Sequence, residues 1–284
     1  MHNTILLAVD PSTLDLTADD RLLADALEHR GANVRPLVWG DPLPLPRGAV
    51  VVVRSTWDYV ESPERFTVWL DMLDDQHAVV YNPTSMIRWN MHKSYMLGLA
   101  TRGVPIVPTC LLLRGSDQTL DRVSAGRGWD DVVIKPAVGA TARLTVHVGR
   151  IGHEQAETHL QDVLAREDVL IQPYLPAVVT EGELSVVAIA GELTHAVVKR
   201  PRHGDWRVQS EFGGSSERVP LDQTLRAAAH TVLAALDTVP LYARIDLVSD
   251  GRQSRLIELE LIEPELFFRF APESADAMAD LLLS

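Results

Sequence analysis

The sequence predicts an α/β protein whose later part is α+β. Apolar strand-like segments and amphipathic helix-like segments alternate over about the first hundred residues, which is typical of a doubly wound, mostly parallel sheet. From about residue 105, short strands follow one another through tight turns, which indicates antiparallel pairing. The chain has 284 residues and exceeds the usual size of one domain. We therefore expect a division into residues 1–104, 105–175 and 176–284.

The first part is expected to open with the buried strand "TILLAVD", followed by a helix over 18–31 that stops at Gly31. The segments "NVRPLVW", "AVVVV" and "AVVYNP" predict further strands. A helix is expected after Ser62, which serves as its cap, with Pro63 at the first helical position. A last helix is predicted over 91–103.

The later part contains two hairpin signals, the Ala190-Gly191 turn and "SDGRQSR". The segments "DVVIKPAV" and "RLTVHVG" are interpreted as a strand pair across a loop, and "DVLIQPYLP" as another strand. Helices are predicted over 152–167 and 222–236. These elements favour two α+β sub-domains after the α/β part.

Composition excludes several classes of function. A net charge of −13 makes the chain a poor candidate for binding the phosphate backbone of nucleic acids. No apolar run approaches the roughly 18 residues of a membrane span, and the N-terminus resembles neither a signal peptide nor an anchor. The single cysteine, Cys110, excludes an intramolecular disulfide. We expect a cytoplasmic protein without a nucleic-acid or membrane partner.

Charged residues embedded in apolar strands are the main functional signal. Lys135 ends "VVIK", Lys199 ends "HAVVK", and "YARIDLV" and "LIELEL" carry further charges. A buried charge needs a partner, so these residues either form structural salt bridges or face a ligand. Lysines on two strands suggest a polyanion, and carboxylates on two others suggest a hard divalent cation. A magnesium-nucleotide complex would explain both, whereas carboxylates paired with Arg244 remain the alternative.

The order of these motifs resembles the ATP-grasp ligases, in the glutathione-synthetase-like branch. The resemblance runs from about Asn90 to Pro264 and includes "MHKSYMLGLATRG", "VVIKPAVGA", "RVQSEFGG" and "IELELIEP". It implies a nucleotide clamped between two α+β sub-domains and ATP used to make an acyl phosphate.

The resemblance also implies roles for individual residues. Phosphate contacts are implied for Lys93, Lys135 and Lys199, and an adenine-reading hinge for Gln172, Tyr174 and Leu175. Glu181 is implied as the ribose ligand with Glu183 close by, and the implied magnesium ligands are Asp246, Glu258 and Glu260. The position of Glu260 is commonly Asn in the family, so the extra negative charge of Glu260 would change how the site binds the metal.

The loop over the phosphates departs from the family pattern, because "PAVGATARLT" contains only Gly139 where several glycines are usual. Either small residues replace glycine, with the Thr141 hydroxyl as a donor, or the lid is less mobile. Arg143 could reach a phosphate or be a solvated loop charge.

The substrate pocket is expected where the two parts meet. Arg244 is our candidate for holding the substrate carboxylate and the developing oxyanion, and Arg207 is the second. Glycines let the backbone approach a ligand closely, so we expect such an approach at Gly213 and Gly214. Further ligand contacts are expected at the carboxyl end of the parallel strand that ends before Arg54. These additional candidates are Gly213, Gly214, Arg54 for a carboxylate, Ser55, and Asp58 for an ammonium group. Arg54 and Asp58 could instead pair with each other.

The segments "RSTWDY" and "HAVVKRPRHGDWRVQSEFGG" are similar to ATP-grasp cyclo-ligases that form D-cycloserine. That similarity implies O-ureido-D-serine as the small, amino-acid-like substrate, closed into a ring by an internal nitrogen. An intermolecular amide or peptide ligase is the alternative, and a non-catalytic nucleotide-binding module is a third. A homodimer is one assembly that such a chain could form.

Overall fold

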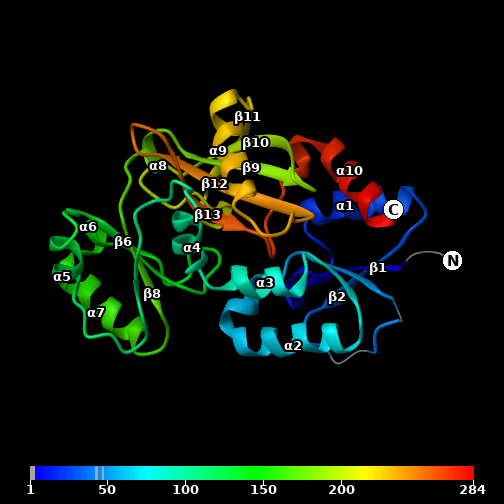
Figure 1. Cartoon of the computed structure of the whole chain (residues 1–284), viewed down its shortest axis with the longest axis horizontal. Helices are drawn as coiled ribbons and strands as arrows, with labels where there is room; N and C mark the ends of the chain where they lie inside the picture. Colours follow the sequence, from blue (N-terminus) through cyan, green and yellow to red (C-terminus); the bar gives the residue numbers. More distant parts are fainter. Residues whose placement is uncertain (1–3, 42–43, 47) are drawn as a thin grey trace.

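The computed structural model describes residues 4–41, 44–46 and 48–284, which form three sheets with helices between them (Figure 1). The first sheet has the order β2-β1-β3-β4 and is parallel throughout, as the alternation of strands and helices predicted. Its strands are β1 (Thr4–Val9), β2 (Asn33–Val38), β3 (Val50–Val53) and β4 (Val79–Tyr81).

Two helices of this part begin as the sequence indicates. In α1 (Ala18–His29) the Thr17 hydroxyl accepts a hydrogen bond from the Asp20 backbone N-H, which satisfies one of the free donors at the helix start. In α2 (Pro63–Asp75) the proline occupies the first turn, where its missing N-H costs nothing. Ser62 occupies the predicted N-cap position, although its side chain makes no capping hydrogen bond.

The single helix predicted over 91–103 is instead two helices, α3 (Thr84–Met91) and α4 (Tyr95–Thr101). The chain leaves the helical conformation at His92, and the Lys93 backbone N-H donates to the Ala137 carbonyl over 2.7 Å. This break matters for function because it turns the Lys93 side chain toward the interior of the molecule.

The second sheet is antiparallel, with the order β5-β8-β6-β7. The predicted strand pair is confirmed, although its second member is only two residues long, and β5 was not predicted. The strands are β5 (Cys110–Leu112), β6 (Val132–Pro136), β7 (Val146–His147) and β8 (Val169–Pro173). The helices of this part are α5 (Leu120–Ala125), α6 (Val148–Ile151) and α7 (His153–Leu164).

The third sheet is also antiparallel and has the order β11-β10-β9-β12-β13. Both predicted hairpins are confirmed, the first turning at Ala190-Gly191 with positive φ at both residues. The strands are β9 (Glu183–Ile189), β10 (Glu192–Arg200), β11 (Ser215–Val219), β12 (Tyr242–Ser249) and β13 (Ser254–Glu260). The helices are α8 (Ala177–Thr180), α9 (Gln223–Ala234) and α10 (Pro272–Leu283).

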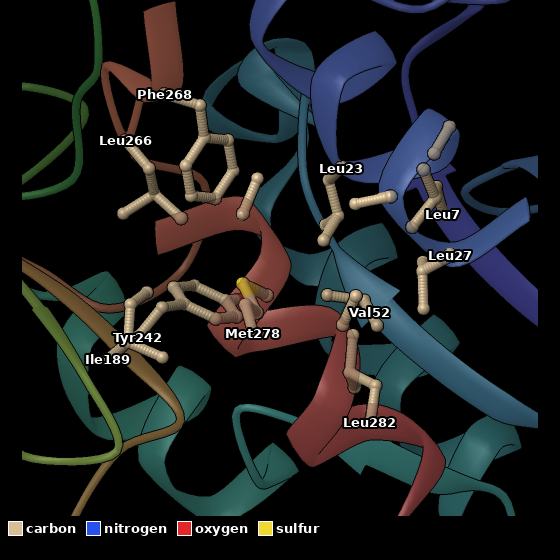
Figure 2. Packing of buried hydrophobic residues seen from close by; sticks show 14 of the residues in the cluster. Leu7, Leu23, Leu27, Val52, Ile189, Tyr242, Leu266, Phe268, Met278 and Leu282 are labelled. Atoms are coloured by element: carbon tan, nitrogen blue, oxygen red, sulfur yellow. The ribbon is translucent and has the colours of Figure 1, made fainter. Parts of the chain in front are cut away.

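The first and third sheets share one hydrophobic core. Figure 2 shows Leu7 and Val52 of the first sheet close to Met278 and Leu282 of α10, with Tyr242 and Ile189 of the third sheet beside them. The same cluster contains Leu23 and Leu27 of α1, which lies next to α10 in Figure 1. The C-terminal helix therefore joins the two sheets by burying apolar area against both.

Tyr242 adds polar contacts to this join. Its hydroxyl lies 2.7 Å from the Val53 carbonyl oxygen and 2.9 Å from the Ile262 carbonyl oxygen, with the Tyr81 carbonyl oxygen at 3.1 Å. The hydroxyl carries one proton, so it donates to one of these oxygens at a time. In the described part of the chain, no helix combines the length and the apolar character needed to cross a bilayer.

Candidate active site

A pocket of about 360 Å³ is lined by residues of all three sheets. The first sheet contributes Arg54, which directly follows β3, and the second contributes residues of β6 and β8. The third sheet contributes side chains of β9, β10, β12 and β13. All of the charged residues that the sequence singled out inside apolar strands line this one pocket, namely Lys135, Lys199, Arg244, Asp246, Glu258 and Glu260. Lys93 and Glu183, which only the family resemblance implied, line it as well.

Strand alternation explains why these charges share a face. In β12, Arg244 and Asp246 point into the pocket, whereas the alternate residues Ala243 and Ile245 pack into the core on the other side. β13 pairs with β12 so that Glu260 lies opposite Arg244 and Glu258 opposite Asp246. The two glutamates therefore point to the same face, as alternation along a strand requires.

Asp246 is the centre of a buried network. Its carboxylate accepts hydrogen bonds from the Ser185 hydroxyl at 2.6 Å, from Lys199 Nζ at 3.0 Å and from Arg244 Nη2 at 3.0 Å. Burial alone would raise the pKa of Asp246, but the charges of Arg244 and Lys199 hold it well below its usual range. Lys199 also pairs with Glu183, Nζ to Oε1 at 2.5 Å.

The two glutamates of β13 are held by different cations. Glu258 pairs with Lys93 at 3.0 Å, and Glu260 pairs with Arg244. Burial raises the pKa of Glu260 to about 7. The nearby charges of Glu258 and Asp246 also raise this pKa, and together with burial they outweigh the lowering by Arg244. Among the described residues, no three acidic, histidine or cysteine side chains are close enough to hold a metal ion as they stand. Each carboxylate is drawn to a lysine or arginine instead.

Lys135 differs from the other lysines of the pocket. Within the described residues its ammonium group makes no hydrogen bond or ion pair, and burial lowers its pKa. Lys93, by contrast, pairs with Glu258 and donates to the Gly139 carbonyl. An unpaired, partly buried cation that faces a pocket suits an anionic ligand.

The segment that joins β8 to α8 forms another wall, with Gln172, Tyr174 and Leu175 lining it. The Tyr174 backbone N-H donates to the Asp131 carbonyl over 2.9 Å, and its ring stacks on His147 with the ring centres 3.8 Å apart. The Gln172 amide donates to the Thr109 hydroxyl over 2.9 Å. These contacts hold the segment rigidly beside the pocket.

The lid, residues 136–145, has a backbone conformation that glycine would adopt more easily than the residues present. Thr141, Ala142 and Leu144 have φ of 48°, 55° and 51°, in the left-handed region that L-residues avoid. The lid therefore holds residues other than glycine in a backbone conformation that favours glycine. Arg143 lines the pocket but pairs with Glu167 at 3.1 Å, so it is not simply a solvated charge.

The first sheet presents Arg54 and Ser55 to the pocket. Arg54 is 2% exposed; its Nε donates to Asp20 over 2.7 Å and its Nη2 to the Pro264 carbonyl over 2.9 Å. Its Nη1 is buried without a hydrogen-bond partner. The expected alternative, a pair with Asp58, is wrong because Asp20 takes that place.

Arg207 also lines the pocket, from the segment between β10 and β11. Its Nη2 pairs with Asp205 at 3.0 Å, and its guanidinium carbon lies 3.6 Å from the centre of the Phe212 ring. These contacts fix the guanidinium at the pocket wall.

Four expected site residues lie outside the pocket. Asp58 accepts a hydrogen bond from the indole of Trp39, and Glu181 is an exposed residue at the end of α8. A Cβ on Gly214 would lie 2.1 Å from the Val208 carbonyl oxygen, so this glycine permits a close backbone contact within the protein. Gly213 has φ +81° and packs against Arg202.

Two buried acidic residues of the pocket were not assigned a role from the sequence. Asp19, at the start of α1, accepts backbone hydrogen bonds from Leu266 and Phe268, both at 2.7 Å. Glu263 is 9% exposed and follows the end of β13. The density of glutamates in "LIELELIEPELFF" was a signal for Glu263, but period-2 alternation does not extend past the end of the strand.

Comparison with known proteins gives matches along nearly the whole chain. Residues 105–267 match the family model of the prokaryotic glutathione synthetase ATP-grasp domain, and residues 5–82 match that of the N-terminal domain of D-cycloserine synthetase DcsG. Cycloserine biosynthesis protein DcsG of Streptomyces lavendulae is 28% identical over 98% of this chain and 97% of its own length. Glutathione synthetase of Prochlorococcus marinus is 28% identical over 76% of this chain and 69% of its own.

Solved structures agree with these matches. The crystal structure of D-cycloserine synthetase DcsG has a TM-score of 0.88 at 27% identity and covers 98% of each chain. D-alanine–D-alanine ligase from Bacillus anthracis has a TM-score of 0.69 at 15% identity, over 100% of this chain and 95% of its own, and thus shares the fold. The matched glutathione-synthetase model spans more than half of the chain. The chain therefore belongs to the ATP-grasp family of C–N bond-forming ligases, enzymes that use ATP with Mg²⁺.

Proposed function

We propose that this protein activates the carboxylate of a small amino-acid-like substrate as an acyl phosphate and joins it to a nitrogen. The observation that carries the proposal is the single pocket in which lysines of three elements face carboxylates of β12 and β13. Similarity to DcsG along the whole chain favours the finer assignment, closure of O-ureido-D-serine to D-cycloserine. The division at 1–104, 105–175 and 176–284 is part of the same proposal.

The nucleotide would lie between the second and third sheets. We assign the adenine to the wall formed by Gln172, Tyr174 and Leu175, and the phosphates to Lys93, Lys135 and Lys199. Lys135 supports this assignment best, because its ammonium group has no partner among the described residues. The lid at Thr141 would close over the phosphates, with Glu183 beside the nucleotide.

Magnesium fits the donor set of the pocket. Asp246, Glu258 and Glu260 supply carboxylate oxygens, the ligands that Mg²⁺ prefers beside substrate phosphates. The raised pKa of Glu260 reflects crowding of negative charge that a cation would relieve. To bind the ion, the carboxylates would turn partly away from Lys93 and Arg244. When bound, magnesium neutralises phosphate charge during transfer.

The chemistry needs charge stabilisation rather than a strong base. A carboxylate oxygen of the substrate bonds to the γ-phosphorus of ATP as the bond to the β–γ bridging oxygen breaks, which releases ADP. A nitrogen then attacks the acyl carbon, loses its proton, and phosphate leaves. We assign Arg244, aided by Arg207, to hold the substrate carboxylate and the oxyanion of the tetrahedral intermediate.

With O-ureido-D-serine, the attacking nitrogen is the one bonded to the side-chain oxygen, and attack closes a five-membered ring. That nitrogen carries the carbamoyl group, so release of free D-cycloserine also requires water to remove it as carbamate. Arg54 and Ser55 are assigned to the substrate end of the pocket, where Arg54 Nη1 lacks a partner.

An intermolecular amide ligase is the second candidate, because the longest matched family model is that of glutathione synthetase. The experiment is a phosphate-release assay with ATP and Mg²⁺ against a panel of small amino acids that includes O-ureido-D-serine. We expect release to require one compound and to disappear in Glu258→Gln. Mass spectrometry of the product then separates a ring from a linear amide. ATP binding without stimulated release by any compound would favour a non-catalytic nucleotide-binding module.

A further inference from the structure

We propose that Glu263 forms a subsite for a positively charged amino group of the substrate. The inference rests on the proposed function, since it assigns the substrate to this pocket. It adds a feature of substrate class: the compound carries an ammonium group in addition to the carboxylate that is activated.

Glu263 lacks the cation that the neighbouring carboxylates have. Each of the other buried or partly buried carboxylates at the centre of the pocket has a cation beside it: Lys199 for Glu183 and Asp246, Lys93 for Glu258, Arg244 for Glu260, and Arg54, at 3.6 Å, for Asp19. Glu263 is buried and lines the same pocket. Within the described part of the chain, its carboxylate makes no ion pair and no hydrogen bond to a side chain.

The backbone on both sides of Glu263 is held in place. The Glu263 carbonyl accepts a hydrogen bond from the Trp57 indole at 3.2 Å, and the carbonyl of Pro264 accepts one from Arg54 at 2.9 Å. On the other side, the Ile262 carbonyl oxygen lies 2.9 Å from the Tyr242 hydroxyl. The backbone around Glu263 is therefore anchored to the first and third sheets, which fixes where the Glu263 side chain enters the pocket.

The electrostatic surroundings fit the same role. A buried carboxylate without an ion-pair partner is costly, and a ligand cation would remove that cost. Burial, together with the nearby charge of Glu260, raises the pKa of Glu263 to about 8. A cation beside Glu263 would lower this pKa and restore the carboxylate.

The position of the subsite agrees with the shape of an amino acid. Arg54, whose Nη1 lacks a partner, contacts the residue that follows Glu263. A donor for an oxygen and an acceptor for an ammonium group thus lie at one end of the pocket. Asp58, which the sequence suggested for the ammonium group, is engaged with Trp39 outside the pocket.

The test compares two compounds and three proteins. O-ureido-D-serine is compared with 3-(ureidooxy)propanoic acid, which is the same molecule without the amino group. Wild type, Glu263→Gln and the control Glu273→Gln are assayed for phosphate release with ATP and Mg²⁺. Glu273→Gln removes one negative charge from α10, outside the pocket.

In wild type we expect the KM of the deamino compound to be at least tenfold higher than that of O-ureido-D-serine. Glu263→Gln should raise the KM of O-ureido-D-serine at least tenfold and leave that of the deamino compound within about twofold. In Glu273→Gln both KM values should match wild type. Equal increases for both compounds in Glu263→Gln, or no increase, would overturn the subsite.

Binding measurements keep this test separate from the proposed function. Calorimetric titration of both compounds, with Mg²⁺ and a non-hydrolysable ATP analogue, reports the subsite even if phosphate is never released. Loss of tenfold or more in affinity for the amine-bearing compound alone supports Glu263. Absent binding, or binding without preference for the amine, contradicts it. Glu263→Asp retains the charge, and it should recover part of the loss if Glu263→Gln folds poorly.

Discussion

Lys199 on β10 reaches across β9 to Asp246 on β12, and its Nζ lies 3.0 Å from Oδ2. The same ammonium group pairs with Glu183 on the strand between them. One cation therefore balances two carboxylates that face the pocket from neighbouring strands. Removing it would leave Glu183 buried without a cation and Asp246 with Arg244 alone.

We expect Lys199→Met to lower the free energy of unfolding by about 3 kcal/mol, because breaking a buried ion pair leaves the remaining carboxylate buried without its cation. Urea unfolding monitored by circular dichroism measures the change. A stability equal to wild type would contradict the network described.

Lys135→Met should behave in the opposite way. Lys135 forms no ion pair within the described residues, and burial of its charge outweighs the attraction of Glu258, so its removal should leave the free energy of unfolding unchanged or slightly increased. ATP affinity, measured by calorimetry with Mg²⁺, should fall by roughly a hundredfold, since a charge-assisted phosphate contact is lost. Unfolding at lower urea with ATP affinity retained would assign Lys135 a structural role instead.

Replacing Ala142 by glycine should relieve backbone strain in the lid. A left-handed conformation costs an L-residue about 1–2 kcal/mol, which glycine avoids. Glycine also has more conformational freedom in the unfolded chain, and this freedom offsets part of the gain in stability. We expect a net gain of up to about 1 kcal/mol, seen as a higher thermal midpoint. Ala140→Gly, in the same lid but without a positive φ, is the control and should destabilise slightly.

Gly214→Ala should destabilise the loop next to the pocket. The added Cβ would lie 2.1 Å from the Val208 carbonyl oxygen, so the backbone must shift, at a cost of about 2 kcal/mol or more. Gly98→Ala provides a control, because it lies in α4 with open space around it and should stabilise the helix by up to about 1 kcal/mol. Equal thermal midpoints for the two variants would refute this account.

His195 predicts a pH dependence of stability. Its side chain is buried, with Nδ1 beside the Thr194 hydroxyl and Nε2 without a partner, and burial lowers its pKa to about 4. Because the ordinary pKa is about 6.5, the unfolded chain binds the proton more readily between pH 6.5 and 4. Stability should therefore fall as the pH drops through this range, by about 2 kcal/mol. His195→Leu should show a smaller fall in urea titrations at pH 7.5 and 5.

The repeating parts of the fold could be predicted from sequence because their signals are local. Alternation placed Arg244 and Asp246 on one face, and the turn residues Ala190-Gly191 marked a hairpin. The break at Lys93 could not be predicted, because helical periodicity continues through it and a contact to the distant Ala137 causes it.

The site could be predicted only where strands carry it. Glu181 and Glu183 are two residues apart at the end of the hinge, and only the short helix α8 decides which of them enters the pocket. Glu263 and Gly214 lie beyond strand ends, where tertiary contacts with Trp57 and Val208 set the conformation. Local pattern carries no information about such contacts.

The core that α10 shares with the first sheet has a consequence for biosynthesis. Leu7, Leu23 and Val52 emerge from the ribosome early, but the residues that cover them, including Met278 and Leu282, are translated after the rest of both sheets. Domains normally fold as units while the chain is still being made. Here the nascent first sheet must keep an apolar surface open until nearly all of the chain has been translated, which makes it a natural client for a chaperone.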